Sequence, residues 1–330
     1  MRTADSLTCE RLLGGQDPVE CAKTGTCVVL QYHRVASLCH DPLQMGVAPC
    51  NFERQMEYLA EGCHVISTDD IRRHLRRGIP FAERTVAITF DIGYRDTLAA
   101  VQEVLERLAL PATVFVVSTS LLGEQPFWWD LLEDLLIADE LNDRLEMEIG
   151  GQPQVLPLTT QQERFRAFDR LFSLLAAQTA SQRCRSMENL AHQLGLRTGD
   201  RDFHPPLRAQ EVRELDARRL ITIGGHTHHC VRLSALSRAQ QMEEIGKNKA
   251  VLEEVLGHPI EQFSYPFGQE DSCTPQTANI LRDLGFKLAF GGSYGAISTA
   301  AGAAPYDVPR VKVGNWNPYT FHKFLEQFFA

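Results

Sequence analysis

The feature that most restricts the fold of this chain is a recurring pair, in which a short uninterrupted apolar run precedes an amphipathic helical stretch. The run at 27–32 precedes a helical pattern at 51–60, the run at 85–90 precedes one near 95–109, and a third run follows at 112–117. Uninterrupted apolar runs are typical of strands that are buried on both faces. Their alternation with helices predicts a parallel sheet of the α/β class.

The alternation stops at 124–205, where the pattern is strongly helical, and resumes from about 219. We therefore expect an N-terminal arm at 1–26 and a single α/β domain at 27–330, interrupted by a helical insertion at 124–205. The second half predicts strands at 219–225, 262–268, 287–292 and 308–313, a helix at 238–256 and a terminal helix at 320–329.

Composition excludes several classes of protein. Hydrophobic residues make up 44% of the chain, as in ordinary globular domains, and the formal net charge of -9 disfavours a nucleic-acid binder. No apolar run reaches the roughly 18 residues of a membrane span, and the N-terminus lacks a secretory pattern. Nine cysteines without a C-x-x-C pair are typical of a reducing compartment. We expect a cytoplasmic protein with a small-molecule substrate and no nucleic-acid or membrane partner, and the sequence predicts no oligomeric state.

Residues that can carry chemistry stand where the predicted strands end. They include acids, imidazoles, a thiol and a guanidinium: His33, Asp91, His226, His228, His229, Cys230 and Arg310. The carboxyl ends of the strands of a (β/α) barrel meet on one face, where active sites form. The sequence therefore predicts one active site built from these residues.

Five motifs carry a resemblance to the polysaccharide deacetylases, the NodB-homology group of carbohydrate esterases (family four). T-F-D-I-G-Y at 89–94 resembles the motif T-F-D-D-G-Y, and H-T-H-H-C at 226–230 resembles H-[ST]-x-x-H. F-S-Y-P-F-G at 263–268 resembles a third motif that lacks its usual Arg, and V-P-R-V at 308–311 resembles a later Arg-bearing strand. V-L-Q-Y-H-R-V at 29–35 resembles the opening strand of a permuted subgroup.

The resemblance covers 27–120 and 219–324, and it implies a distorted (β/α) barrel. In the family, one Asp and two His hold a divalent metal, a further Asp acts as base and a His protonates the leaving amine. The resemblance accordingly implies that Asp91 is the base, His33 the acid and His226 the first His ligand. Arg310 would orient and charge-balance Asp91.

Two positions depart from the family pattern. Ile92 stands where the family has its metal-binding Asp, and Cys230 stands where it has the second His. Isoleucine has no donor atom, whereas a thiolate binds zinc well. Two alternatives stay open: the site holds zinc through His226 and Cys230 with His229 or another neighbour, such as His228 or Asp91, or it holds no metal.

Four aromatic residues are candidate substrate contacts, namely Tyr94, Tyr265, Phe267 and Trp128. For Trp128 the alternative is packing that clamps the insertion onto the barrel.

Three functions fit these residues. The first is a hydrolase that removes an N-acyl group from a small soluble amino sugar or related metabolite. The second is a metal-independent acid–base enzyme (isomerase, cyclase, lyase or cyclic-amide hydrolase) that uses Asp91, His33 and His226. The third is a non-catalytic binding protein. Three retained ionisable groups disfavour the third, because buried charge is costly.

Overall fold

The computed structural model of the chain describes residues 25–123, 126–137, 143–194, 205–268, 274–299 and 304–329. Most of the N-terminal arm expected at 1–26 lies outside these residues. None of the helices in the described ranges is both long and apolar enough to cross a membrane.

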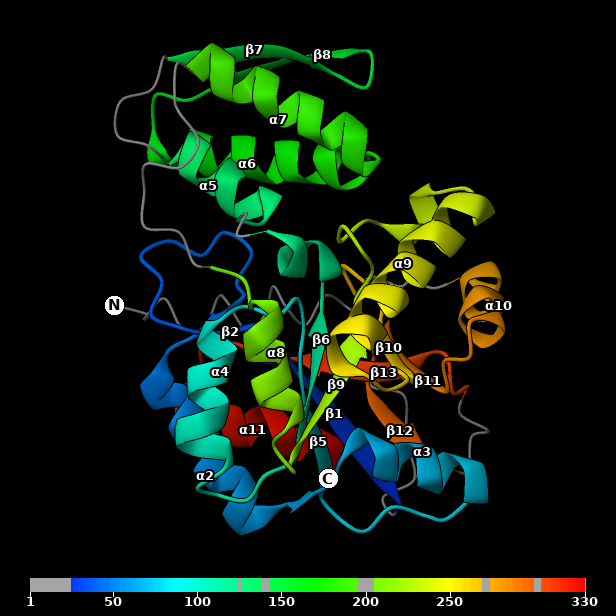
Figure 1. Cartoon of the computed structure of the whole chain (residues 1–330). Coiled ribbons are helices and arrows are strands. Elements are labelled where there is room, and N and C mark those ends of the chain that lie inside the picture. The colour runs from blue at the N-terminus through cyan, green and yellow to red at the C-terminus, as the bar shows by residue number, and fades with distance from the viewer. Residues whose placement is uncertain are drawn as a thin grey trace.

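Within the described residues, seven parallel strands close into a barrel, as the sequence predicted (Figure 1). In chain order these strands are β1 (Thr26–Tyr32), β5 (Thr85–Phe90), β6 (Ala112–Val116), β9 (Ile221–Gly225), β10 (Gln262–Ser264), β11 (Leu288–Tyr294) and β13 (Val308–Lys312). The order around the barrel is β1-β13-β11-β10-β9-β6-β5, and the parallel pairing of β1 with β5 closes it. Two short strands extend the rim, the antiparallel β12 (Ala296–Ser298) on β1 and β4 (His64–Val65) on β5.

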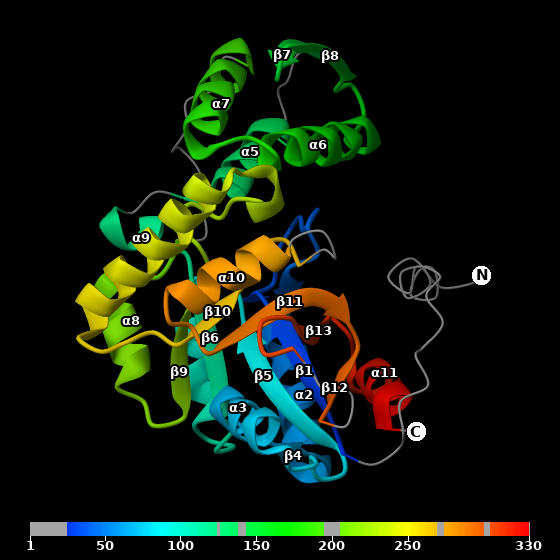
Figure 2. The ribbon, with the colours of Figure 1, turned by 90° about the vertical axis from the view of Figure 1, so that its right-hand side faces the viewer.

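Helices cover the outside of the barrel (Figure 2). They are α2 (Pro49–Gly62), α3 (Thr68–Arg77), α4 (Asp96–Ala100), α8 (Ala209–Asp216), α9 (Arg238–Leu256), α10 (Pro275–Asp283) and α11 (Pro318–Phe329). The barrel region also contains three short helical turns, η1 (Val101–Leu105), η2 (Ser118–Leu122) and η3 (Leu233–Ala235). A small two-stranded sheet pairs β2 (Arg34–Val35) with β3 (Gly46–Val47). The helix predicted near 95–109 is thus shorter, since α4 gives way to the π-helical turn η1.

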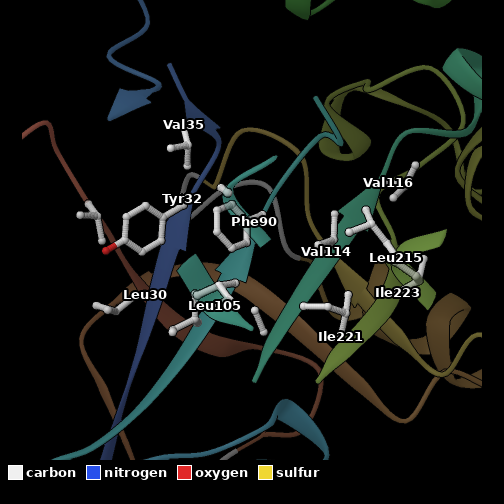
Figure 3. Packing of buried hydrophobic residues seen from close by; sticks show 14 of the residues in the cluster. Leu30, Tyr32, Val35, Phe90, Leu105, Val114, Val116, Leu215, Ile221 and Ile223 are labelled. Carbon is white, nitrogen blue, oxygen red and sulfur yellow. The ribbon is translucent and has the colours of Figure 1, made fainter. Parts of the chain in front are cut away.

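Alternation along each strand separates two cores. Leu30, Tyr32 and Phe90 point outward and pack against the helices (Figure 3). Val29 and Ala87, which lie an odd number of positions away on the same two strands, belong to a separate buried cluster inside the barrel. Because side chains alternate between the two faces of a strand, the next inward positions are Gln31 on β1 and Thr89 on β5. The inner face therefore changes from apolar to polar toward the carboxyl ends of the strands.

Residues 126–137 and 143–194 form a module over the carboxyl ends of the strands (Figure 1). It contains α5 (Trp128–Leu136), α6 (Gln161–Ala176) and α7 (Ala180–Leu194), together with an antiparallel hairpin of β7 (Arg144–Ile149) and β8 (Gln152–Pro157). The hairpin stands beside the helices expected at 124–205: Leu145, Met147 and Ile149 alternate with exposed residues and face those helices. This module has its own apolar cluster, so it packs as a unit.

Candidate active site

Asp91 and Arg310 form the centre of the site. Asp91 follows β5 directly and Arg310 lies in β13, and the two side chains are almost fully buried. Arg310 Nη1 donates to Asp91 Oδ1 at 2.7 Å and Nη2 donates to Oδ2 at 2.8 Å. This two-point pairing is the strongest geometry available to a guanidinium and a carboxylate, and it fixes the carboxylate plane.

Two further side chains complete the shell around the Asp91 carboxylate. Gln31 Nε2 donates to Oδ2 at 2.7 Å, and Ser264 Oγ lies 3.1 Å from both oxygens. Arg310 Nη2 also donates to Ser264 Oγ at 2.7 Å, and Nη1 reaches Thr89 Oγ1 at 3.3 Å. Strands β1, β5, β10 and β13 therefore each contribute to a single polar network.

Two aromatic rings pack against the guanidinium of this network. The Arg310 guanidinium carbon lies 5.8 Å from the ring centre of Phe115 and 6.0 Å from that of Phe290. Burial alone would raise the pKa of the Asp91 carboxyl, but the Arg310 guanidinium holds that pKa well below its usual range. Asp91 is therefore a fixed negative charge at neutral pH and a weak proton acceptor.

Two imidazoles stand near this pair. His33 immediately follows β1 and is partly exposed. Its pKa is lowered to about 3, mainly by burial and then by the Lys312 ammonium, while the Asp91 carboxylate opposes the change. His226 immediately follows β9 and is 2% exposed, and burial lowers its pKa to about 4 against the raising effect of Asp91. Both rings are therefore neutral near pH 7.

Backbone packing positions His226. A Cβ at Gly225 would lie 2.4 Å from Asn248 Oδ1, so only glycine leaves room there for this side chain from α9. Asn248 Oδ1 accepts from the His226 backbone N–H at 3.2 Å, and Asn248 Nδ2 donates to the Val116 and Thr227 carbonyls. The His226 ring bonds the Ser264 backbone, and its Nδ1 has no partner among the described residues.

The other two histidines of the run point elsewhere. His228 Nδ1 pairs with Ser118 Oγ at 2.8 Å, and burial lowers the pKa of His228 to about 4. His229 Nδ1 pairs with Glu244 Oε1 at 2.7 Å, and its backbone N–H donates to Oε2 of the same carboxylate. The structure therefore engages both rings outside the Asp91 network.

Ile92 and Cys230 occupy one apolar cluster. Its other buried members are Tyr94, Val117, Phe127 and Trp129, two of which come from the inserted module. Burial raises the pKa of the Cys230 thiol to about 12, so it stays protonated. Ile92 has φ +78°, a backbone conformation that a β-branched residue rarely adopts and that costs on the order of 1–3 kcal/mol.

The donor atoms present do not fit the metal that the resemblance implies. Asp91 has both oxygens engaged, Ile92 offers no donor and Cys230 is a buried neutral thiol. In the part of the chain that the structure describes, no three His, Cys, Asp or Glu side chains are grouped to hold a metal ion. The expected set of His226, Cys230 and His229 is not brought together, because His229 is paired with Glu244.

Two of the expected substrate contacts are structural in this arrangement. Tyr94 is fully buried; its hydroxyl donates to Asp130 and accepts from Trp129 Nε1 at 2.6 Å. Tyr265 is also fully buried, and its hydroxyl donates to the Tyr306 carbonyl at 2.8 Å. Neither ring offers surface to a substrate, because each phenol is needed to satisfy buried partners.

The other two expected contacts lie at the seam between the module and the barrel. Phe267 follows β10 with φ +67°, and its ring meets Phe172 of α6 edge-on at 5.9 Å. Trp128 lies on the module side of the seam, where its ring stacks on that of Phe172 with the ring centres 5.0 Å apart. Both are only partly buried.

Four residues of the network had no place in the sequence-based prediction: Gln31, Thr89, Ser264 and Asn248. Strand alternation could have found Gln31 and Thr89, since each stands two positions before a predicted site residue, His33 or Asp91, and thus on the same face. Ser264 lies within the quoted motif at 263–268. No local signal marks Asn248, because its role depends on how α9 packs against β9.

The chain belongs to the polysaccharide deacetylase family. The family model for polysaccharide deacetylase matches residues 78–142 and 175–289, which is more than half of the chain. These ranges include the Asp91 turn, the histidine run and the motif at 263–268. The search of curated proteins found no match.

Solved structures share the fold. Streptococcus pyogenes deacetylase PplD, in complex with acetate, has a TM-score of 0.57 and 16% identity, covering 95% of this chain and 100% of that one. IcaB from Ammonifex degensii has a TM-score of 0.56 and 20% identity, covering 93% and 98%. A de-N-acetylase from Aggregatibacter actinomycetemcomitans has a TM-score of 0.54 and 13% identity, covering 91% and 99%. At these identities the likeness concerns the fold.

Proposed function

We propose that this chain is a carbon–nitrogen hydrolase that removes the N-acyl group of a small soluble amino sugar or related metabolite, and that its own imidazoles perform the proton transfers. The observation that carries the proposal is the placement of two neutral histidines, His33 and His226, beside an Asp91 carboxylate that Arg310 holds ionised. Family membership supports the bond type.

The reaction balances with these groups alone. A water oxygen attacks the acyl carbon, and a neutral imidazole takes the proton that the water loses. The carbon–nitrogen bond then breaks, and the imidazolium returns the proton to the departing amine. Because burial lowers the pKa of both histidines, each neutral ring is a weak base and each protonated ring is a strong acid toward the amine. The fixed Asp91 charge stabilises the protonated ring and so offsets part of this loss of basicity.

The position of the inserted module supports a small substrate. The module packs on the segments that follow β5, β9 and β10 through contacts of Tyr94, Cys230 and Phe267. It therefore covers part of the face where the strand ends meet (Figure 1). His33, which is partly exposed, lies at the end of β1, and we infer that the substrate enters on this side. The proposal includes the cytoplasmic setting expected from the sequence.

The test is acetate release from N-acetylated amino sugars by the untagged protein, measured with and without EDTA. Release that EDTA leaves unchanged, and that His33→Gln and Asp91→Asn abolish, is the expected result. His322→Gln is the matched control, because His322 is an exposed histidine on α11. Release that EDTA abolishes and zinc restores would contradict the imidazole chemistry.

A second candidate is a metal-independent isomerase, cyclase, lyase or cyclic-amide hydrolase on the same scaffold. The apolar environment of Ile92 and Cys230 favours it, since the donors for the family's metal-assisted hydrolysis are replaced by packing. Mass spectrometry of the same incubations separates the two. A product of unchanged mass, or one that has lost or gained only water, without released acetate would indicate the second candidate.

A further inference from the structure

A cavity of about 600 Å³ lies at the seam between the inserted module and the barrel. The module contributes Trp128, Leu131 and Met187 to its lining, and the barrel contributes Val117, Ser120 and His229. Asp91 and Arg310 are not among the lining residues. The volume is that of a typical small-molecule site, about 300–1,000 Å³.

Two residues that line this cavity each carry a buried donor without a partner in the described part of the chain. Arg183 of α7 is only 4% exposed; its Nη2 donates to the His229 carbonyl at 2.9 Å, whereas its Nη1 has no partner among the described residues. In the same described part of the chain, the buried Nε1 of Trp128 also has no partner. The Arg183 guanidinium carbon lies 4.8 Å from the Trp128 ring centre, so the two donors are neighbours.

An unpartnered donor in a buried position is costly, and a buried guanidinium without a counter-charge is more so. No described carboxylate lies within ion-pair distance of Arg183. Glu244, whose charge acts on Arg183 from farther away, is paired with His229, and Glu188, the acidic residue of the lining, is exposed. An anion bound inside would satisfy both donors at once. The remaining walls are apolar and aromatic, with Phe127, Leu131 and Met187 among them.

We propose that this cavity binds a small monocarboxylate with a flat apolar body, whose carboxylate accepts from Arg183 Nη1 and Trp128 Nε1. A carboxylate can accept a charge-assisted hydrogen bond from Nη1, since the His229 carbonyl engages only Nη2, and the apolar body matches the aromatic walls. The single negative charge follows from Glu188, which would repel a second anionic group at the edge. The inference does not depend on the chemistry proposed for Asp91.

The test is isothermal titration calorimetry of the full chain with benzoate, 2-naphthoate and hexanoate, each paired with its neutral primary amide. At least one carboxylate should bind saturably with one molecule per chain, and its amide should bind about tenfold more weakly or not at all. Arg183→Met keeps an apolar stem, removes the guanidinium and should weaken carboxylate binding by about tenfold or more. Arg185→Met is the matched control, because Arg185 is an exposed arginine on the same helix.

Trp128→Phe provides a second variant should Arg183→Met fail to fold, since it keeps an aromatic ring opposite Phe172 and removes only the Nε1 donor. It should weaken the carboxylate several-fold and leave the affinity for the amide little changed. Saturable binding by none of the three carboxylates would overturn the proposal. Equal affinity for carboxylate and amide, or an unchanged affinity in Trp128→Phe, would also overturn it.

Discussion

Arg310 holds both carboxylate oxygens of Asp91, at 2.7 and 2.8 Å, where neither residue is more than 4% exposed. A buried pair of this kind is stable only as a pair, because removal of one partner leaves the other charge without compensation. The same ion pair lowers the pKa of Asp91 and keeps its carboxylate ionised at neutral pH. The function proposed above therefore assigns proton transfer to the neighbouring imidazoles.

Asp91→Asn should lower the free energy of unfolding by about 3–5 kcal/mol, because it leaves the Arg310 guanidinium buried and unpaired. Urea unfolding at pH 7 measures this loss. Asp216→Asn, which removes a partner of the exposed His258, is the control and should change stability by less than about 1 kcal/mol. A loss of similar size in the two variants would contradict the assigned importance of the buried pair.

Acid should weaken the wild-type protein through the same residue. The pKa of Asp91 in the folded protein lies below its value in the unfolded chain, so the unfolded chain binds more protons in acid. The free energy of unfolding should therefore fall as the pH drops below about 4, the usual carboxyl pKa. Chemical unfolding between pH 5 and pH 3 tests this, and a smaller fall in Arg310→Gln would assign it to the pair.

Asp130 should act in the opposite direction and in a different pH window. Burial raises its pKa to about 7, with Asp134 and Asp96 adding to the rise and Arg34 and the Tyr94 hydroxyl opposing it. The folded protein then keeps a proton that the unfolded chain releases. The free energy of unfolding should accordingly fall as the pH rises from about 4 to 7.

Asp130→Asn should reduce this dependence, to which Glu133 also contributes because burial raises its pKa to about 8, and should raise stability at pH 8 by on the order of 2 kcal/mol. Thermal unfolding at pH 5, 6, 7 and 8 measures the effect. Asp69→Asn, at a largely exposed aspartate of α3, serves as the control and should leave the pH profile in place. A profile that stays unchanged in Asp130→Asn would show that another group titrates.

Ile92→Asp combined with Cys230→His should create metal binding, which the donor set of the wild-type protein does not favour. The pair would supply two donors beside His226, and an Asp tolerates the positive φ of position 92 better than an Ile. Elemental analysis after incubation with zinc should find about one zinc per double-variant chain. Stoichiometric zinc in the wild-type protein, lost in His226→Gln, would contradict our interpretation of the donor set.

Tyr94→Phe should loosen the inserted module. The change leaves Trp129 Nε1 without its acceptor and Asp130 without its donor, at a cost of about 1–3 kcal/mol. Limited proteolysis should cleave within 126–194 sooner than in the wild type. Tyr319→Phe is the control because Tyr319 is 70% exposed. Equal cleavage rates in the two variants would argue that the bonds of Tyr94 to Asp130 and Trp129 do not hold the module on the barrel.

Much of the barrel could be predicted from short-range pattern. The run at 85–90 coincides with β5, and the stripe at 238–256 coincides with α9, which begins at its Ser237 cap and ends before Gly257 at φ +78°. The hairpin of β7 and β8 was missed. Its alternating residues lie within a predominantly helical segment, and they pack only because α5, α6 and α7 provide a surface.

The candidate site was predictable in its centre and not in its surroundings. Asp91, His33, His226 and Arg310 follow from motif and strand end, since parallel strands bring their carboxyl ends to one face. Tyr94 and Tyr265 were expected to contact substrate, yet an aromatic side chain at a strand end can point either toward a ligand or into the protein. The orientation of these two rings depends on hydrogen-bond partners from other segments, namely Asp130, Trp129 and the Tyr306 carbonyl.

The strand–helix order, the residues at each strand end, the absence of a donor atom at position 92 and the thiol at position 230 follow from the sequence alone, because these are properties of local pattern and residue type. What surrounds positions 92 and 230 depends on the tertiary structure. Ile92 and Cys230 lie in an apolar cluster with Phe127 and Trp129 of the inserted module, and Arg183 is left with an unused donor beside a cavity. These relationships join residues far apart in the chain, and packing between separately folded segments sets them.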